Sequence, residues 1–185
     1  EFGAPQWVFG MSTYTFTRAG DLVCAYGSRG LWRLATLKDG RLRPLALPFT
    51  DFSSIKCAGE RVACLAGAAD QPASVTLIDP TSGDYEIVRR SVNVVVEPGY
   101  LAAPQPIEYP TENDLTAYAL YYAPRNADFL APAGEKPPLI VFSHGGPTGN
   151  AQSTLNLHIQ YWTSRGFAVV DVDYGGSAGY GRAYR

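Results

Sequence analysis

Residues 138–147 read Pro-Leu-Ile-Val-Phe-Ser-His-Gly-Gly-Pro, an apolar run that passes directly into a pair of glycines. The run predicts a buried strand, and the glycines predict a tight turn where the strand ends. Because glycine has no Cβ, its backbone can come close to a bound molecule. The N–H of Gly146, and after it that of Gly145, is therefore the candidate donor to an oxygen that gains negative charge. The alternative is that both glycines only permit the change of chain direction.

The chain on either side of this turn predicts further elements of one sheet. Apolar residues recur at helical spacing over residues 154–165, with Ser153 as the candidate N-cap and Gly166 as the stop. Residues 167–172 then predict a second apolar strand. A strand, turn, helix and strand in succession predict two parallel neighbouring strands. Upstream, Asn113-Asp114 lies between two strand-like runs and predicts a hairpin.

Residues 1–90 have a different pattern, made of short strand-like runs separated by turn residues. Runs that begin at Leu22 and Leu31 return at Arg61 and Ser74. A repeat of about 40 residues with four strands is typical of a β-propeller blade. On the repeat alone, a plain antiparallel sandwich is an equal alternative. Residues 91–110 contain four prolines, which predict a stiff connection between two units.

Composition excludes several classes of function. With 185 residues, 46% of them hydrophobic, the chain can form one ordinary domain or two small ones. A net charge of −2 with scattered basic residues argues against a partner that is nucleic acid or an anionic membrane. No apolar stretch approaches the roughly 20 residues of a membrane span. Cys24, Cys57 and Cys64 are odd in number and irregularly spaced, which predicts reduced core thiols and favours a cytoplasmic protein.

Three segments together resemble one known family. They are Ser-His-Gly-Gly-Pro at 143–147, the run at 160–170, and the block rich in Gly, Tyr and Arg at 173–185. The last block is the most specific, because strand or helix patterning does not produce it. On these segments the chain resembles the prolyl oligopeptidase family of serine peptidases, in its acylaminoacyl-peptidase and dipeptidyl-aminopeptidase branch. The resemblance is strong over residues 105–185 and weak but compatible over residues 1–90.

The resemblance implies both a fold and an activity. The expected fold is all-β blades of a β-propeller followed by the N-terminal part of an α/β-hydrolase domain. Residues 1–100 would be the C-terminal blades and residues 101–185 the start of the hydrolase (peptidase) domain. The complete enzyme would hydrolyse short peptides through an acyl-enzyme, without a metal or organic cofactor. The triad Ser, Asp and His is expected downstream of Arg185. This chain would then supply the oxyanion-hole backbone and be inactive alone.

Four residues are expected to shape the site rather than to react. His144 and Pro147 flank the two glycines, and His144 opens the turn instead of facing a serine nucleophile. It is therefore expected to form a hydrogen bond that shapes the loop, not to act as the triad base. Tyr180 and Arg182 are expected to brace the loop between the two domains, where a substrate would pass.

Other polar residues near the turn carry weaker hypotheses. Ser177 lies in Gly-Gly-Ser-Ala-Gly, which lacks the Gly-x-Ser-x-Gly frame of a nucleophile, and a structural role is expected. His158 lies in the predicted helix and is expected at the surface or in packing. Asp171 and Asp173 alternate along a strand end, but no third ligand is spaced to complete a metal site.

Two other functions stay open from the residues. One is a non-catalytic binding module made of propeller and hydrolase remnant, and the other is an esterase of the α/β-hydrolase class. The expected partners are short peptide substrates for the complete enzyme, together with either the remaining part of the peptidase as a companion chain or a second copy of this chain. A partner of this kind is expected because an incomplete sheet leaves an apolar edge. Glu1 and Phe2 are given no structural role.

Overall fold

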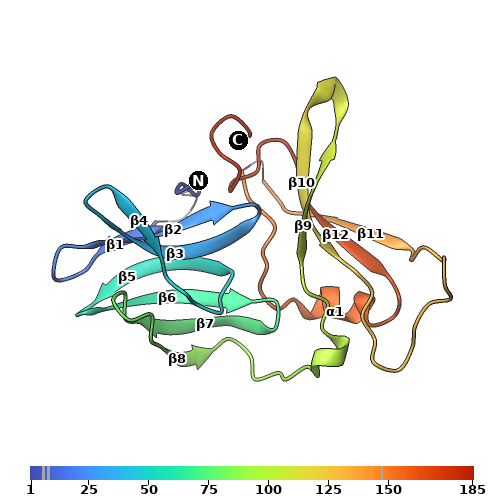
Figure 1. The fold of residues 1–185 in the computed structure, drawn as a ribbon, viewed down its shortest axis with the longest axis horizontal. Coiled ribbons are helices and arrows are strands. Elements are labelled where there is room, and N and C mark those ends of the chain that lie inside the picture. The colour runs from blue at the N-terminus through green and yellow to red at the C-terminus, as the bar shows by residue number, and fades with distance from the viewer. Residues whose placement is uncertain (6, 8, 147) are drawn as a thin grey trace.

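The computed structural model describes residues 1–5, 7, 9–146 and 148–185, and these form three four-stranded sheets, one short α-helix and two 3₁₀ turns (Figure 1). The first two sheets are antiparallel meanders, in which strands that follow one another in the chain are also neighbours in the sheet. The first consists of β1 (Tyr14–Phe16), β2 (Leu22–Ser28), β3 (Leu31–Lys38) and β4 (Arg41–Pro44). The second consists of β5 (Asp51–Ala58), β6 (Arg61–Ala68), β7 (Gln71–Ile78) and β8 (Tyr85–Arg90).

The turns of the first sheet explain why it forms a meander. Arg29 and Gly30, between β2 and β3, have φ of 52° and 74°, and Asp39 and Gly40, between β3 and β4, have φ of 50° and 71°. Two consecutive residues with positive φ are typical of the tight hairpin turn that matches the twist of the strands. The sequence prediction of strands separated by turns is therefore confirmed for this sheet. Two successive four-stranded units also agree with the repeat seen in the sequence.

The first two sheets share one hydrophobic core. Val23 and Leu34 from the first sheet lie in the same buried cluster as Phe52, Ile55 and Val62 from the second. The alternation of buried and exposed positions along β6 shows that one face of the strand points into this core. A four-stranded meander cannot bury an apolar face by itself, so the two sheets depend on each other for stability.

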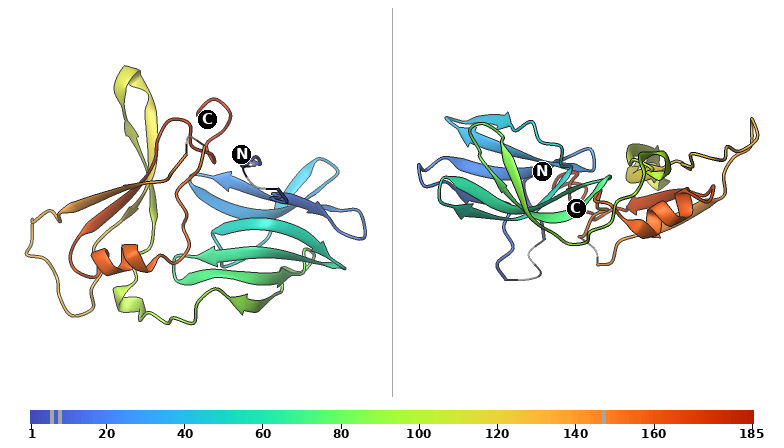
Figure 2. Two further views of the ribbon diagram at one scale, coloured as in Figure 1. Left: turned by 180° about the vertical axis from the view of Figure 1, so that it is seen from behind. Right: turned by 90° about the horizontal axis from the view of Figure 1, so that it is seen from below.

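The third sheet is mixed and lies beside the other two (Figures 1 and 2). Its strand order is β11-β12-β10-β9. The strands are β9 (Gln105–Pro110), β10 (Thr116–Tyr122), β11 (Leu139–Ser143) and β12 (Ala168–Asp173). β11 and β12 are parallel, as the strand–turn–helix–strand pattern predicts, whereas β10 is antiparallel to both β12 and β9. The predicted hairpin is the β9–β10 pair, closed by the 3₁₀ turn Glu112–Asp114, and the other 3₁₀ turn is Pro98–Tyr100.

The helix is shorter than predicted. It is α1 (Leu157–Thr163), and its N-cap is Asn156, whose Oδ1 accepts hydrogen bonds from the N–H groups of His158 and Ile159 at 3.0 and 3.4 Å. The prediction of Ser153 as N-cap is wrong. The Ser153 hydroxyl is 3.0 Å from the Thr50 carbonyl, to which it donates, and this contact holds the segment before α1 against the second sheet.

The outer strand of the third sheet leaves apolar side chains uncovered. Leu139 and Val141 on β11 are 55% and 62% exposed. Their neighbours Ile140 and Phe142 point the opposite way and pack against the core that includes Leu120. One face of β11 is therefore covered by the chain and the other is open. Within the described residues, no helix is long and apolar enough to cross a membrane.

Candidate functional site

The glycine turn follows β11 and is open to solvent. Gly145 and Gly146 are both exposed, and a Cβ added to Gly145 would meet no atom within 4 Å. Neither N–H group donates a hydrogen bond to an acceptor among the described residues. Two adjacent main-chain donors therefore stay available to a bound molecule. Pro147, predicted to shape this turn, lies outside the described residues.

Gly146 is at a position that favours glycine. Its φ is 69°, in the left-handed region that other residues enter at a cost. The indole of Trp7 also lies directly against it, because a Cβ at residue 146 would be 2.2 Å from Trp7 Cη2. The backbone conformation therefore favours glycine here, and any larger residue would also have to displace the Trp7 ring, which is 60% exposed. No local sequence pattern predicts the contact with Trp7, since the two residues are far apart in the chain.

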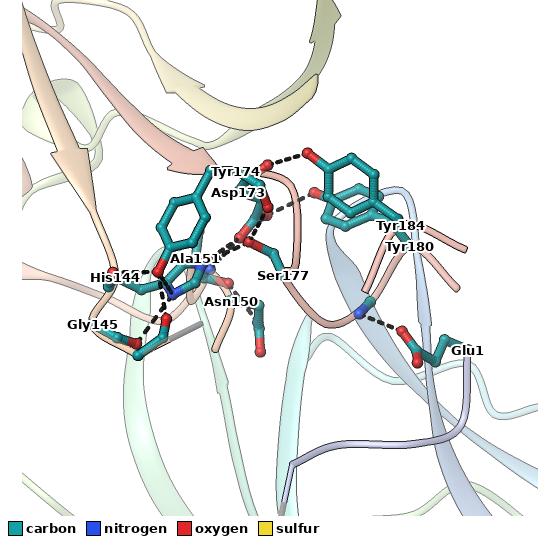
Figure 3. A network of polar contacts seen from close by, with 12 residues as sticks. Glu1, His144, Gly145, Asn150, Ala151, Asp173, Tyr174, Ser177, Tyr180 and Tyr184 are labelled. Carbon is teal, nitrogen blue, oxygen red and sulfur yellow. Dashed lines mark hydrogen bonds and ion pairs between the residues drawn. The ribbon is translucent and has the colours of Figure 1, made fainter. Parts of the chain in front are cut away.

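The His144 side chain is held in place by the loop that follows β12 (Figure 3). His144 Nε2 is 2.7 Å from Ser177 Oγ, and its ring stacks on Tyr174 with 4.5 Å between ring centroids. The Ser177 hydroxyl donates to the Tyr174 carbonyl at 2.7 Å, so it accepts from His144 and the imidazole proton lies on Nε2. The Tyr174 hydroxyl in turn donates to the carbonyl of Gly146. The ring and the turn are therefore fixed by the same two residues.

Ser177, His144 and Asp173 lie close together, but they do not have the geometry of a catalytic triad. Asp173 Oδ1 is 3.8 Å from Nε2, the nitrogen that already bonds to Ser177, whereas a triad acid bonds to the other nitrogen. Ser177 is also fully buried, with 0% of its surface exposed. The arrangement can orient a loop, but it cannot present a serine to a substrate.

Asp173 is the buried centre of this network. It accepts hydrogen bonds from the N–H of Ala151 at 2.6 Å and from the hydroxyl of Tyr180 at 2.7 Å. Burial raises its pKa, while these two bonds and the nearby His144 oppose that rise. Burial also raises the pKa of Asp171 to about 6, with a smaller contribution from Asp173. Within the described part of the chain, no group of three His, Cys, Asp or Glu side chains could hold a metal ion.

Tyr180 and Arg182 have different surroundings. Tyr180 stacks on Tyr118 with ring centroids 4.2 Å apart, and its hydroxyl would be 2.6 Å from a Cβ added to Gly30 in the first sheet. It therefore lies between the first and third sheets. Arg182 is exposed and makes no hydrogen bond or ion pair with the residues that the structure describes. The expected brace at Arg182 is thus not seen, and Arg185 makes an ion pair with Glu1 instead.

A cavity of about 410 Å³ opens beside the turn. Its lining includes Trp7, Trp32, Phe52 and Asp51, and the edge of the turn at Gly145. Burial raises the pKa of Asp51 to about 6, against the effect of the Ser153 and Phe52 N–H groups. Sequence reasoning missed this cavity because its walls come from the N-terminal segment, β5 and the turn. The site can hold an apolar group beside the turn, whose two main-chain donors have no acceptor in the described part of the chain.

His158, expected at the surface or in packing, is exposed, and its ring lies tilted against that of Phe142, with ring centroids 5.2 Å apart. The residues that sequence reasoning missed in the polar network are Tyr174, Glu1 and Arg185. Tyr174 adjoins Asp173 in the block at 173–185, so its position could have been a signal. The role of Glu1 had no signal, because its contacts lie at the opposite end of the chain.

Comparison with known proteins gives structural relatives. No protein-family model matches the chain, and no curated protein matches it. A Mycobacterium tuberculosis puromycin-hydrolysing peptidase is similar over 100% of this chain, with 37% identity and a TM-score of 0.91. A puromycin hydrolase is similar over the same span, with 34% identity and a TM-score of 0.88. The chain spans 28% of the length of each of these two proteins. An acylaminoacyl peptidase from Pyrococcus horikoshii is 25% identical over 94% of this chain, with a TM-score of 0.62, and the match covers 26% of that protein.

Proposed function

Because this chain belongs to the prolyl oligopeptidase family of serine peptidases, we propose that it forms part of an enzyme that hydrolyses short peptides through an acyl-enzyme. In this proposal residues 1–100 are blades of a β-propeller and residues 101–185 begin an α/β-hydrolase domain. The two meanders and the mixed third sheet support this division. The complete enzyme is also proposed to be cytoplasmic, since Cys24, Cys57 and Cys64 are free thiols, although only Cys24 and Cys64 are buried and the expectation of a core position was wrong for Cys57.

The observation that carries the proposal is the exposed turn, whose two N–H groups at residues 145 and 146 have no acceptor among the described residues. A serine hydroxyl that attacks a peptide carbonyl forms a tetrahedral intermediate, whose oxygen carries the negative charge. The N–H of Gly146, with that of Gly145 as the second candidate, would donate to this oxygen. Donors about 2.7–3.1 Å from the oxyanion give the required stabilisation. The cavity beside Gly145 would receive an apolar side chain of the substrate.

The remaining catalytic groups are proposed to lie outside these 185 residues. A serine would form the acyl bond, and a histidine would take its proton and pass it to the leaving amine. An acid would orient that histidine, and water would then release the acyl group by the reverse proton transfers. His144 would not take part in these transfers, because its Nε2 is bound to the buried Ser177.

The test compares the hydrolytic activity of the complete enzyme with that of the isolated chain. We expect the complete enzyme to release nitroaniline from aminoacyl-nitroanilides and to be blocked by a serine-directed phosphonate, and the isolated chain to do neither. Puromycin is included as a substrate because of the relatives found above. Turnover by the isolated chain, or a complete enzyme that cleaves only carboxylic esters, would contradict the proposal.

A further inference from the structure

The carboxylate of Glu1 is held by three donors from the loop after β12. Residues 174–185 form this loop, which we name the tyrosine–glycine loop. Glu1 Oε2 accepts from the N–H groups of Gly179 and Gly181 at 2.7 and 3.2 Å, and Oε1 pairs with Arg185 Nη1 at 2.8 Å. The Glu1 side chain is only 7% exposed, so solvent screens these contacts weakly. A carboxylate with three short contacts is an ordered part of the structure.

The backbone of the loop is shaped to receive a negative charge. Gly179 and Gly181 have φ of 101° and 95°, which lets two N–H groups point at one carboxylate. Backbone concavities of this kind bind anions. The strand β2 fixes the other side of the contact, because the main-chain nitrogen of Glu1 donates to the carbonyl of Gly27 at 2.9 Å and the Gly27 N–H donates back at 2.7 Å. Glu1 therefore joins the first sheet to the loop (Figure 3).

The same loop holds the glycine turn. Ser177 Oγ bonds to His144 at 2.7 Å, and the N–H of Ala178 donates to the carbonyl of Gly149 at 2.9 Å. Both contacts lie within two residues of Gly179. A displacement of the loop at Gly179 would thus pass to both ends of the segment 144–149, which contains the candidate oxyanion donors.

We propose that Glu1 is a positioning residue, which sets the glycine turn at residues 145–146 through the tyrosine–glycine loop. The expected effect on catalysis rests on the proposed function. The contact between Glu1 and the tyrosine–glycine loop is a structural feature that does not depend on that function. Its physical basis is that loss of the carboxylate leaves two N–H groups and Arg185 without their acceptor, and removes the polar contacts that tie the loop to the chain segment paired with β2.

The experiment uses the complete enzyme with Glu1→Ala, Glu1→Gln and a matched control, Glu86→Ala. Glu86 also pairs with an arginine, Arg61, at 3.0 Å, but this pair is exposed on the second sheet. We expect Glu1→Ala to lower kcat about tenfold or more while KM changes less than about twofold, since a small misplacement of catalytic donors reduces the rate of the chemical step. Glu1→Gln keeps an acceptor oxygen and should fall between Glu1→Ala and the wild type. Glu86→Ala should match the wild type.

Hydrogen exchange gives a second readout that needs no activity. Amides of residues 174–181 and 144–149 should exchange faster in Glu1→Ala than in the wild type and the control. Unchanged exchange in these segments would overturn the inference, and so would faster exchange with an unchanged kcat. A Glu1→Ala variant that keeps the wild-type kcat but has a higher KM and a lower thermal stability would also overturn it. If the wild type lacks hydrolytic activity, the proposed function fails, and exchange at residues 144–149 then decides the positioning role by itself.

Discussion

At the scale of single residues, Gly146 offers the sharpest test of the turn. We expect Gly146→Ala to destabilise the complete enzyme by about 1–3 kcal/mol, because the added Cβ meets the Trp7 ring and the backbone keeps a left-handed φ. Activity should fall as well, since the turn must move to relieve the contact. Thermal unfolding and kcat with an aminoacyl-nitroanilide measure the two effects.

Gly145→Ala is the matched control for this change. Residue 145 has open space where a Cβ would lie, and alanine retains the N–H group. We expect its thermal midpoint to stay close to that of the wild type, and the comparison uses stability alone because Gly145 is itself a candidate oxyanion donor. Equal losses of stability in the two variants would show that neither the contact with Trp7 nor the left-handed φ of Gly146 constrains the turn.

The partly buried carboxyl group of Asp171 should make the free energy of unfolding depend on pH. Its pKa in the folded chain is about 6, above the ordinary value near 3.8, because burial and the neighbouring Asp173 disfavour the charged form and His144 opposes this only in part. The folded state therefore binds more protons between about pH 4 and 6, and the free energy of unfolding falls as the pH rises through this window. Above about pH 6 this contribution stays constant.

Asp171→Asn should remove this penalty. We expect the variant to be more stable than the wild type at pH 8, by at most about 2 kcal/mol because the side chain is only half-buried. Below pH 4 the difference should vanish. Denaturant unfolding at both pH values measures it, and an equal effect at pH 4 and pH 8 would show that the carboxylate charge is not the cause.

At the scale of elements, mutation of Asn156 tests the N-cap of α1, which the structure places at Asn156 and not at Ser153. Asn156→Ala should destabilise the chain by about 1 kcal/mol, since the N–H groups of His158 and Ile159 lose their acceptor. Asn156→Asp retains an acceptor and should have little effect. Unfolding in denaturant measures both variants, and a wild-type value for Asn156→Ala would contradict the cap.

The elements show what the sequence could and could not predict. Strand-like runs, the hairpin at Asn113-Asp114 and the parallel neighbours β11 and β12 follow from local patterns, and the structure confirms them. The start of α1 could not be predicted from local sequence. Ser153 has the chemistry of a cap, but its hydroxyl donates to the carbonyl of Thr50, about a hundred residues away in the chain. A local pattern carries no information about such a distant acceptor.

The same reason limits what could be predicted about the site. Gly145, Gly146 and His144 stand out because they adjoin a strongly apolar strand. The groups that hold them come from elsewhere: Ser177 and Tyr174 from the loop after β12, and Trp7 from the N-terminal segment. Their roles depend on how the sheets are placed relative to one another, which residue spacing does not encode. Glu1, whose contacts lie 178 and 180 residues away, is the extreme case.

At the scale of the whole molecule, the open face of β11 predicts how the isolated chain behaves. Leu139 and Val141 are more than half exposed on a strand with one free edge, and such an edge can pair with another chain. We expect the isolated 185-residue chain to self-associate and the same face to be covered in the complete enzyme. Size-exclusion chromatography with light scattering measures the association.

Val141→Lys tests whether this face is responsible. A charge in the middle of the apolar face should shift the isolated chain toward the monomer, since burial of an unpaired lysine against another chain is unfavourable. Leu130→Lys is the control, because Leu130 is 95% exposed but lies in the loop before β11 rather than in the sheet. It should leave association unchanged.

A wild-type chain that is a monomer with a cooperative melt would contradict the expected self-association. It would show that the third sheet is stable with β11 uncovered, and that no companion is needed to fold it.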